Sequence, residues 1–208
     1  SDFAVFSFYA TKSITCGEGG AIITNHKKYV DIIKSISNNG MTKPAFKRFE
    51  NNKYIPWDVY DYGFKANLSD INASILEEQV INYTKTAKIK KKIFNDYKQA
   101  LSSIKQISLP TENKNKNRDY YLFPIGVKSN IRNKLISFLL ENKIFVTVNF
   151  RSITDLSYYK KKYKVFDCKE SKKWGEETLS LPFHSKITKN EIKIVSKKIQ
   201  EFFSKTIQ

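Results

Sequence analysis

The stretch that decides the fold of this 208-residue chain reads Phe6-Ser7-Phe8-Tyr9-Ala10-Thr11-Lys12-Ser13-Ile14-Thr15-Cys16-Gly17-Glu18-Gly19-Gly20. It places Lys12 between a short apolar strand and a glycine-rich turn, and a second apolar strand follows over residues 20–24. A lysine that forms a Schiff base needs a rigid turn, partial removal from water and small neighbours that admit a flat cofactor. The residues alone make Lys12 a candidate for this role, and an ordinary solvated lysine is the alternative.

The same fifteen residues resemble the lysine motif of the DegT/DnrJ/StrS-type sugar aminotransferases, which are pyridoxal-phosphate (PLP) enzymes of the aspartate-aminotransferase-like fold type I. Residues 61–79, 148–159 and 179–184 resemble later landmarks of that family in order and spacing. The resemblance implies an α/β fold. Residues 1–85 would be the C-terminal part of the large PLP-binding domain, and residues 86–208 a small α/β C-terminal domain.

The resemblance also implies roles for individual residues. Lys12 would be the catalytic residue that holds PLP as a Schiff base and shuttles a proton, whereas the dehydratase branch of the family has histidine there. Ser7 matches the serine that hydrogen-bonds the cofactor phosphate, and a strand-end serine bonded to backbone is the alternative. Tyr9 lies where the family has histidine or tyrosine near the cofactor.

Lys65 and Asn67 depart from the family pattern. Many members have an asparagine at the position of Lys65, which reaches the cofactor phosphate of the partner subunit. A lysine could bind the same phosphate as a point charge, or it could be a solvated loop lysine, and both readings stay open. Asn67 stands where many members have arginine. Arg151 and Asn149 fall where the family shapes its sugar-binding mouth, so Arg151 could meet a diphosphate or form a surface ion pair.

The implied reaction moves an amino group, usually from glutamate, to a keto group of a nucleotide-linked sugar in polysaccharide or amino-sugar biosynthesis. A homodimer is implied for the full-length protein, because the family builds its active site between subunits. A complete member carries a large portion before the lysine motif, so we expect this chain to be a C-terminal fragment that is inactive alone. A catalytically silent interaction module with an exposed apolar surface is the alternative.

Composition narrows the class of protein. A hydrophobic content of 40% with 14% aromatic residues is sufficient for a packed core. No run of about 18 apolar residues occurs, and no secretory signal is recognisable, so we expect neither a membrane span nor export. Cys16 and Cys168 show no metal-ligand spacing, which favours reduced thiols in a cytoplasmic protein without a metal site. His26 and His184 have no partner cluster in the sequence and are interpreted as structural.

The net charge of +17 comes from 33 lysines and 4 arginines against 20 acidic residues. Specific nucleic-acid readers depend on arginine, and no nucleic-acid-binding signature accompanies the charge, so nucleic acid is not expected as a partner. A biased coding composition is one explanation for the lysine content. The charge could also attract anionic ligands such as nucleotide diphosphates.

Apolar spacing predicts strands over residues 3–8, 20–24, 119–127 and 145–150, and helices over residues 27–38, 70–102, 131–142, 170–178 and 188–203. The segment 70–102 is one long helix or two joined by a bend; Ser69 is its predicted cap, and Ile71, Ile75 and Val80 indicate an amphipathic face. Residues 41–62 and 104–118 are predicted to be irregular. The strand–helix alternation in the second half indicates a small α/β unit.

Overall fold

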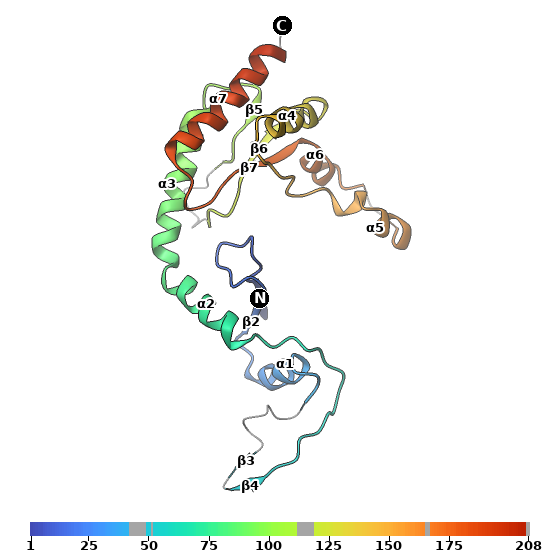
Figure 1. The fold of residues 1–208 in the computed structure, drawn as a ribbon. Helices are drawn as coiled ribbons and strands as arrows, with labels where there is room; N and C mark the ends of the chain where they lie inside the picture. The colour runs from blue at the N-terminus through green and yellow to red at the C-terminus, as the bar shows by residue number, and fades with distance from the viewer. Residues whose placement is uncertain (42–48, 51, 112–118, 165–166, 207–208) are drawn as a thin grey trace. The chain divides into compact units, whose positions relative to one another are not determined.

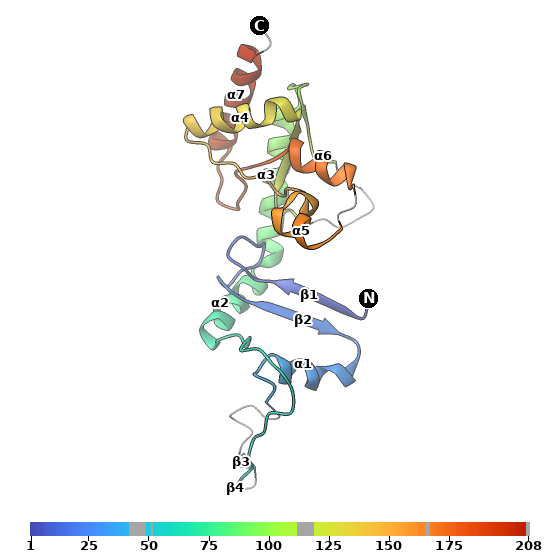
Figure 2. The ribbon, with the colours of Figure 1, turned by 90° about the vertical axis from the view of Figure 1, so that its right-hand side faces the viewer.

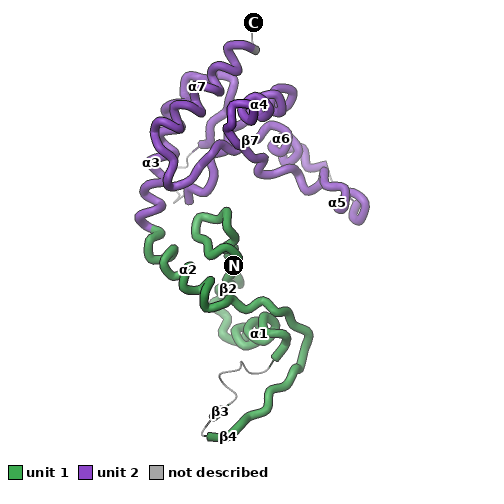
Figure 3. Tube along the Cα trace, in the orientation of Figure 1, with its two compact units in different colours: residues 1–83 green, residues 84–208 purple. Residues whose placement is uncertain are grey.

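The computed structural model describes residues 1–41, 49–50, 52–111, 119–164 and 167–206. The chain divides into two compact units, residues 1–83 and residues 84–208, which are coloured separately in Figure 3. Figures 1 and 2 show the helices and strands of both units from two sides. Among the described residues, no helix combines the length and the apolar character that crossing a membrane requires.

The N-terminal unit begins with an antiparallel hairpin of β1 (Phe3–Ser7) and β2 (Gly20–Thr24). The register runs from Phe3 opposite Thr24 to Ser7 opposite Gly20, so the predicted strands on either side of Lys12 are confirmed. A short 3-10 turn, η1 (Lys27–Tyr29), leads into α1 (Val30–Ile36), where a single helix over residues 27–38 was predicted.

A tight backbone contact follows α1. Gly40 has a φ of +72°, and a Cβ atom there would overlap the carbonyl oxygen of Asp61, so only glycine fits. The chain after Asp61 runs beside the end of α1, where Phe64 N donates to Ile36 O at 2.6 Å. Part of the predicted irregular segment 41–62 is a small hairpin of β3 (Phe49–Glu50) and β4 (Lys53–Tyr54). Residues 42–48 and 51 of that segment lie outside the described residues.

Two helices follow in the chain, α2 (Asp70–Ile81) and α3 (Tyr83–Leu101), and Asn82 separates them. Ser69 is the N-cap of α2, as predicted, because its Oγ accepts a hydrogen bond from Asn72 N at 3.2 Å. The predicted amphipathic face of α2 was wrong. Its apolar side chains are distributed around the whole helix, and none of its residues is buried within this chain.

The core of the C-terminal unit is a three-stranded antiparallel sheet in the order β5 (Ile107–Ser108), β6 (Phe123–Val127) and β7 (Thr178–Leu181). Side chains of β6 and β7 share one buried cluster with residues of α3, α4 (Ser129–Glu141) and α7 (Lys189–Thr206). The helices 131–142 and 188–203 predicted from sequence are therefore confirmed, with α4 starting two residues earlier and α7 ending later.

Phe123 lies at the centre of this core. Its ring stacks on Tyr97 with centroids 4.9 Å apart and meets Phe94 edge-on at 5.0 Å, and all three residues have no exposed surface. Tyr97 donates a hydrogen bond from its hydroxyl to Pro182 O at 2.9 Å. Burial, followed by the charge of Glu191, raises the pKa of Tyr97 well above its usual range.

The predicted strand over residues 145–150 was wrong. Within this segment only Thr147 pairs with another strand residue, forming an isolated bridge with Ser180 through hydrogen bonds of 2.7 and 3.2 Å. The apolar residues alternate here because Ile144 is buried and Val146 packs on the same core. This packing does not require a continuous strand. The strand that does form there is β7, which was missed because it has four residues and because Thr178 and Ser180 interrupt its apolar pattern.

Smaller differences concern element ends. The predicted strand 119–127 begins only at Phe123, and β5 lies within the segment 104–118 that was predicted to be irregular. The described helix α6 (Lys169–Glu177) confirms the helix predicted over residues 170–178. The turn η3 (Ile153–Asp155) and the lysine-rich helix α5 (Ser157–Lys162) had no sequence prediction. Residues 112–118 lie outside the described residues.

Replacing Phe123 by alanine should destabilise the C-terminal unit by about 3–5 kcal/mol, because it leaves a cavity between Tyr97 and Phe94. Phe145 is the matched control: its side chain is 73% exposed, so Phe145→Ala should change the free energy of unfolding by less than about 0.5 kcal/mol. Urea denaturation followed by circular dichroism measures both. Equal effects of the two substitutions would contradict this description of the core.

Candidate functional site

The backbone closes the loop that carries Lys12. Phe8, just after β1, donates from its N–H to Gly19 O at 2.8 Å, and its carbonyl accepts from Cys16 N at 3.1 Å. Lys12 N–H donates to Tyr9 O at 2.9 Å, which forms a turn inside the loop. The ladder of the hairpin therefore continues one residue beyond β1, and the loop starts from a fixed base.

Side chains inside the loop hold its second half. The hydroxyl of Thr15 donates to Phe8 O at 3.1 Å and accepts from Gly17 N at 3.1 Å. Gly17 has a φ of +87°, a backbone angle that glycine adopts without steric cost. The Cys16 side chain is 5% exposed, and its Sγ lies 3.3 Å from Glu18 O as a weak donor.

Helix α2 is attached to the same loop. The amide of Asn72 donates from Nδ2 to Glu18 O at 2.9 Å, across 54 residues of sequence. A Cβ atom at Gly19 would lie 2.8 Å from Cys16 Sγ and 3.0 Å from Leu68 Cδ1, so glycine permits this close approach. Sequence reasoning missed Asn72. The signal that could have found it is its place in the first turn of a capped helix, where polar side chains reach neighbouring loops.

The structure places Lys12 and Ser7 on the same hairpin. Lys12 is half-buried at the middle of the loop, and Ser7 is the exposed last residue of β1. Ser7 Oγ accepts a long hydrogen bond of 3.4 Å from Tyr9 N, so the backbone-bonded alternative for this serine is partly realised. A hydroxyl that accepts in this way still has its proton to donate to an anion.

Lys65 lies on the extended segment before α2. Its Nζ donates to Asn67 Oδ1 at 2.6 Å. The two residues that differ from the family pattern, Lys65 and Asn67, are therefore hydrogen-bonded to each other. Lys65 also forms an isolated backbone bridge with Asn38, and both Lys65 and Asn67 are exposed. The lysine ammonium is held beside the chain by this contact.

The donor set of the N-terminal unit is chemically suited to PLP. Such a cofactor needs an amine on a rigid support, donors for its phosphate, and space free of side chains for its flat ring. Lys12 would supply the amine, and the Ser7 hydroxyl and the Lys65 ammonium would be donors. At Gly17 the space that a side chain would take is open.

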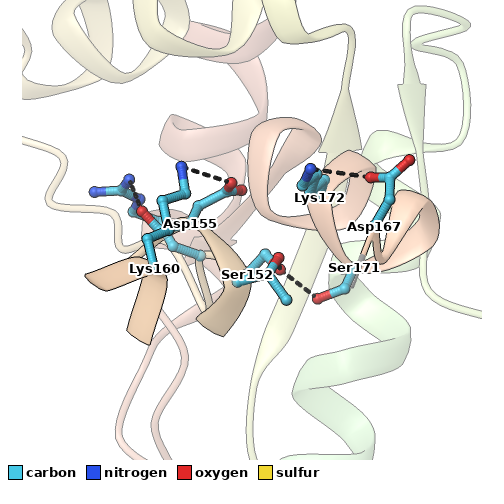
Figure 4. A network of polar contacts seen from close by, with 8 residues as sticks. Ser152, Asp155, Lys160, Asp167, Ser171 and Lys172 are labelled. Carbon is cyan, nitrogen blue, oxygen red and sulfur yellow. Dashed lines mark hydrogen bonds and ion pairs between the residues drawn. The ribbon is translucent and has the colours of Figure 1, made fainter. Parts of the chain in front are cut away.

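Arg151 and Asn149 belong to the C-terminal unit. Arg151 donates from Nη2 to the backbone carbonyl of Asp155 at 3.3 Å, while the Asp155 carboxylate pairs with Lys160 at 3.3 Å (Figure 4). Asn149 accepts from Thr147 Oγ1 through its side chain at 2.8 Å and from Trp174 Nε1 through its carbonyl at 3.2 Å. These contacts fix the segment that was predicted to shape a sugar-binding mouth.

Helix α6 supports that segment through a chain of hydroxyls. Ser171 Oγ donates to Ser152 Oγ at 3.0 Å, and the buried Ser152 is 2.7 Å from Thr154 Oγ1 (Figure 4). Gly175 of α6 permits the close packing, because a Cβ atom there would lie 2.9 Å from Ser152 N. At the start of α6, Lys172 pairs with Asp167 at 2.9 Å.

The histidines occupy surface positions. His26 lies 2.9 Å from the Asp2 carboxylate, and both residues are exposed. His184 is exposed in the C-terminal unit near Glu191, whose pKa is held below its usual range by hydrogen bonds from the Thr188 backbone and hydroxyl. Within the described residues, no group of three or more histidine, cysteine, aspartate or glutamate side chains could hold a metal ion.

The sequence profile of the DegT/DnrJ/EryC1/StrS aminotransferase family matches residues 1–200. The chain belongs to this family. Members of the family depend on PLP, so the fold class and the cofactor expected from the lysine motif are confirmed at the level of the family.

Two curated relatives match over nearly the whole chain. A spore coat polysaccharide biosynthesis protein of Bacillus subtilis is 28% identical over 207 residues, which cover 96% of this chain and 53% of the relative. An uncharacterized protein of Methanocaldococcus jannaschii is 29% identical over 198 residues, which cover 92% of this chain and 51% of the relative. The chain thus spans about half the length of the curated relatives it matches.

Solved structures show the same fold. The aminotransferase TlmJ of Streptoalloteichus hindustanus superposes with a TM-score of 0.88 at 19% identity, over 99% of this chain and 53% of that structure. Helicobacter pylori PseC, an aminotransferase involved in the biosynthesis of pseudoaminic acid, gives a TM-score of 0.86 at 19% identity, over 99% and 54%. A Streptococcus pneumoniae protein in its PLP form gives 0.83 at 21% identity, over 99% and 52%.

Replacing Gly19 by alanine should open the loop around Lys12, because the new methyl group would overlap Cys16 Sγ and Leu68. In a Cys168→Ser background, which removes the exposed thiol, we expect Cys16 to react slowly with Ellman's reagent in the native chain. Gly19→Ala should raise that rate by about tenfold or more, the factor that corresponds to a loss of about 1.4 kcal/mol of protection. The same rate in both variants would show that the loop is not closed in this way.

Proposed function

We propose that this chain provides the lysine-bearing part of a PLP-dependent aminotransferase. The observation that carries the proposal is the position of Lys12, half-buried on a backbone-closed loop in a chain of this family. Residues 1–85 would belong to the large PLP-binding domain and residues 86–208 to the small C-terminal domain. The substrate would be a nucleotide-linked keto-sugar, and the amino donor glutamate.

The names of a curated relative and of a solved structure support the proposed class of substrate. The Bacillus subtilis relative is a spore coat polysaccharide biosynthesis protein, and PseC is an aminotransferase involved in the biosynthesis of pseudoaminic acid. An amino-sugar or polysaccharide pathway in the cytoplasm would agree with both, and a homodimer would be the form of the full-length protein.

The residues of this chain would divide the work as follows. When bound, PLP supplies an electron sink for the carbon atom that gains or loses the amino group. Lys12 Nζ would hold the cofactor covalently and would take and return the proton at that carbon. The Ser7 hydroxyl would donate to the cofactor phosphate, and the Lys65 ammonium would provide a point charge for a phosphate. The Asn72 contact would keep the loop in place.

Lys12 should be the preferred site of PLP attachment. We expect PLP added at an equimolar ratio, followed by borohydride reduction and peptide mass spectrometry, to label Lys12 more than any other of the 33 lysines. Lys12→Ala should remove this labelled peptide and the absorbance of the imine, while Lys28→Ala, an exposed lysine of the same unit, should change neither.

Folding of both variants is checked by circular dichroism. Labelling spread evenly over the surface lysines, both in the chain alone and with the N-terminal half of the Bacillus subtilis relative added, would argue against Lys12 as the attachment site.

A second candidate function is the interaction module without catalysis, which the exposed apolar surface of the N-terminal unit favours. Helix α2 exposes large apolar side chains that this chain leaves uncovered: Ile71 is 75% exposed and Ile81 70%. Val5 of β1 is 76% exposed. We propose that a polypeptide equivalent to the half of the relatives that this chain does not span covers this surface.

The chain alone should therefore bind a hydrophobic dye and self-associate with rising concentration. Ile71→Glu should reduce both dye fluorescence and association, measured by light scattering. Gln79→Glu adds the same charge at an exposed polar position of α2 and should change neither. A chain that stays monomeric at all concentrations and binds no dye would contradict the proposal.

A further inference from the structure

The charge of this protein is divided unequally between its two units. In residues 1–83, nine lysines and arginines balance nine aspartates and glutamates, so the N-terminal unit is neutral. In residues 84–208, 28 basic residues stand against 11 acidic ones, so the C-terminal unit carries the entire net charge of +17. A coding bias toward lysine would raise the lysine content of both units. It therefore does not explain why only the C-terminal unit has a net positive charge. Charge asymmetry of this kind indicates an anionic partner for one unit.

A groove in the C-terminal unit collects part of this charge. It lies between α3 and α7, which run close together in Figures 1 and 2, and has a volume of about 700 Å³. This volume is within the range of small-molecule sites. Its described lining residues are Asp96, Gln99 and Ala100 of α3 and Lys189, Ile192, Lys193, Ser196, Lys197 and Gln200 of α7.

The three lysines form a row along one wall. Lys189, Lys193 and Lys197 are spaced by four residues, so they follow one another on the same side of α7 over about 12 Å. In the described part of the chain, no carboxylate is within ion-pair distance of any of the three. Asp96 is the only acidic residue among the described lining residues, so the groove has a positive balance.

Other lysines of α7 are neutralised locally. Glu201 pairs with Lys198 at 2.9 Å and with Lys205 at 2.8 Å. These two hydrogen bonds lower the pKa of Glu201 to about 2. Glu201 therefore pairs with lysines outside the groove, and Glu191, the other acidic residue of α7, accepts hydrogen bonds from Thr188.

A hydroxyl at the groove also has no partner. Ser196 is 6% exposed, and its Oγ makes no hydrogen bond to any described group. A buried hydroxyl without a partner is unfavourable by about 1–3 kcal/mol, and most buried hydroxyls in proteins are paired. An oxygen-rich ligand on the floor of the groove would supply the missing acceptor.

We propose that the groove between α3 and α7 binds a soluble, phosphate-bearing small molecule with at least two negative charges. Three ammonium groups in a row, a serine hydroxyl and the amides of Gln99 and Gln200 are donors suited to phosphate oxygens. The volume of about 700 Å³ matches a small molecule such as a diphosphate ester. All residues of the site belong to the C-terminal unit, so the site is independent of Lys12 and of the proposed transamination.

Inorganic pyrophosphate is the probe, and isothermal titration calorimetry at constant ionic strength measures its affinity for the full 208-residue chain. Lys189→Gln, Lys193→Gln and Lys197→Gln combined should weaken binding by about tenfold or more. The matched control combines Lys85→Gln, Lys88→Gln and Lys92→Gln. These lysines are exposed on α3 in the same unit, and the control lowers the net charge equally. It should change the affinity less than about twofold.

Asp96→Asn provides a second variant with the opposite sign. Removing the one described carboxylate of the groove should tighten pyrophosphate binding by several-fold, which a misfolded variant would not do. Equal weakening by the two triple variants would overturn the proposal, because binding would then follow total charge. Absence of pyrophosphate binding would overturn it as well.

Two further measurements are needed. One distinguishes a soluble phosphate ligand from a lipid headgroup, and the other distinguishes this groove from the proposed PLP site. Sedimentation with phosphatidylcholine vesicles, with and without a quarter of phosphatidylserine, tests a lipid headgroup. Vesicle binding that needs the α7 lysines, together with no pyrophosphate binding, would reject a soluble ligand. Lys12→Ala should keep its full affinity for pyrophosphate, so a failure of PLP attachment and a failure of this site are distinguishable.

Discussion

The closure of the hairpin loop around Lys12 is the constraint on which the candidate site depends. Phe8 uses both its N–H and its carbonyl to join the two ends of the loop, and Asn72 attaches the first turn of α2 to it. Lysine has a long flexible side chain, so a reactive amine needs a rigid backbone beneath it to be placed reproducibly. Glycine at positions 17 and 19 makes the closure possible, one through its backbone angle and the other by leaving room for Cys16.

The two units are stabilised to very different degrees by this chain. The C-terminal unit buries a continuous cluster around Phe123, Tyr97 and Leu135 and can account for its own fold. The N-terminal unit has Cys16 as its only described buried apolar side chain, while α2 and the hairpin expose theirs. Hydrophobic burial is the main favourable term in folding, so the N-terminal unit depends more than the C-terminal unit on contacts beyond its own residues.

The charge distribution adds a second division between the units. The neutral unit bears the family's lysine motif, and the basic unit bears the groove between α3 and α7. Lysine ammonium groups stay in water, so surface lysines are compatible with many folds. The fold of the C-terminal unit therefore does not by itself dictate where its lysines lie. Their arrangement in a row on α7, without a paired carboxylate in the described residues, is the feature that gives the charge a location.

The sequence by itself determined the family, the hairpin around Lys12, the Ser69 cap and the long helices, because these follow from local pattern and from a fifteen-residue motif. Tertiary structure alone decided β7, which is too short and too polar to be recognised, and the lack of a strand over residues 145–150. It also decided the contact of Asn72 with Glu18. Local sequence specifies backbone preference, whereas a contact across 54 residues exists only once packing has brought both partners together.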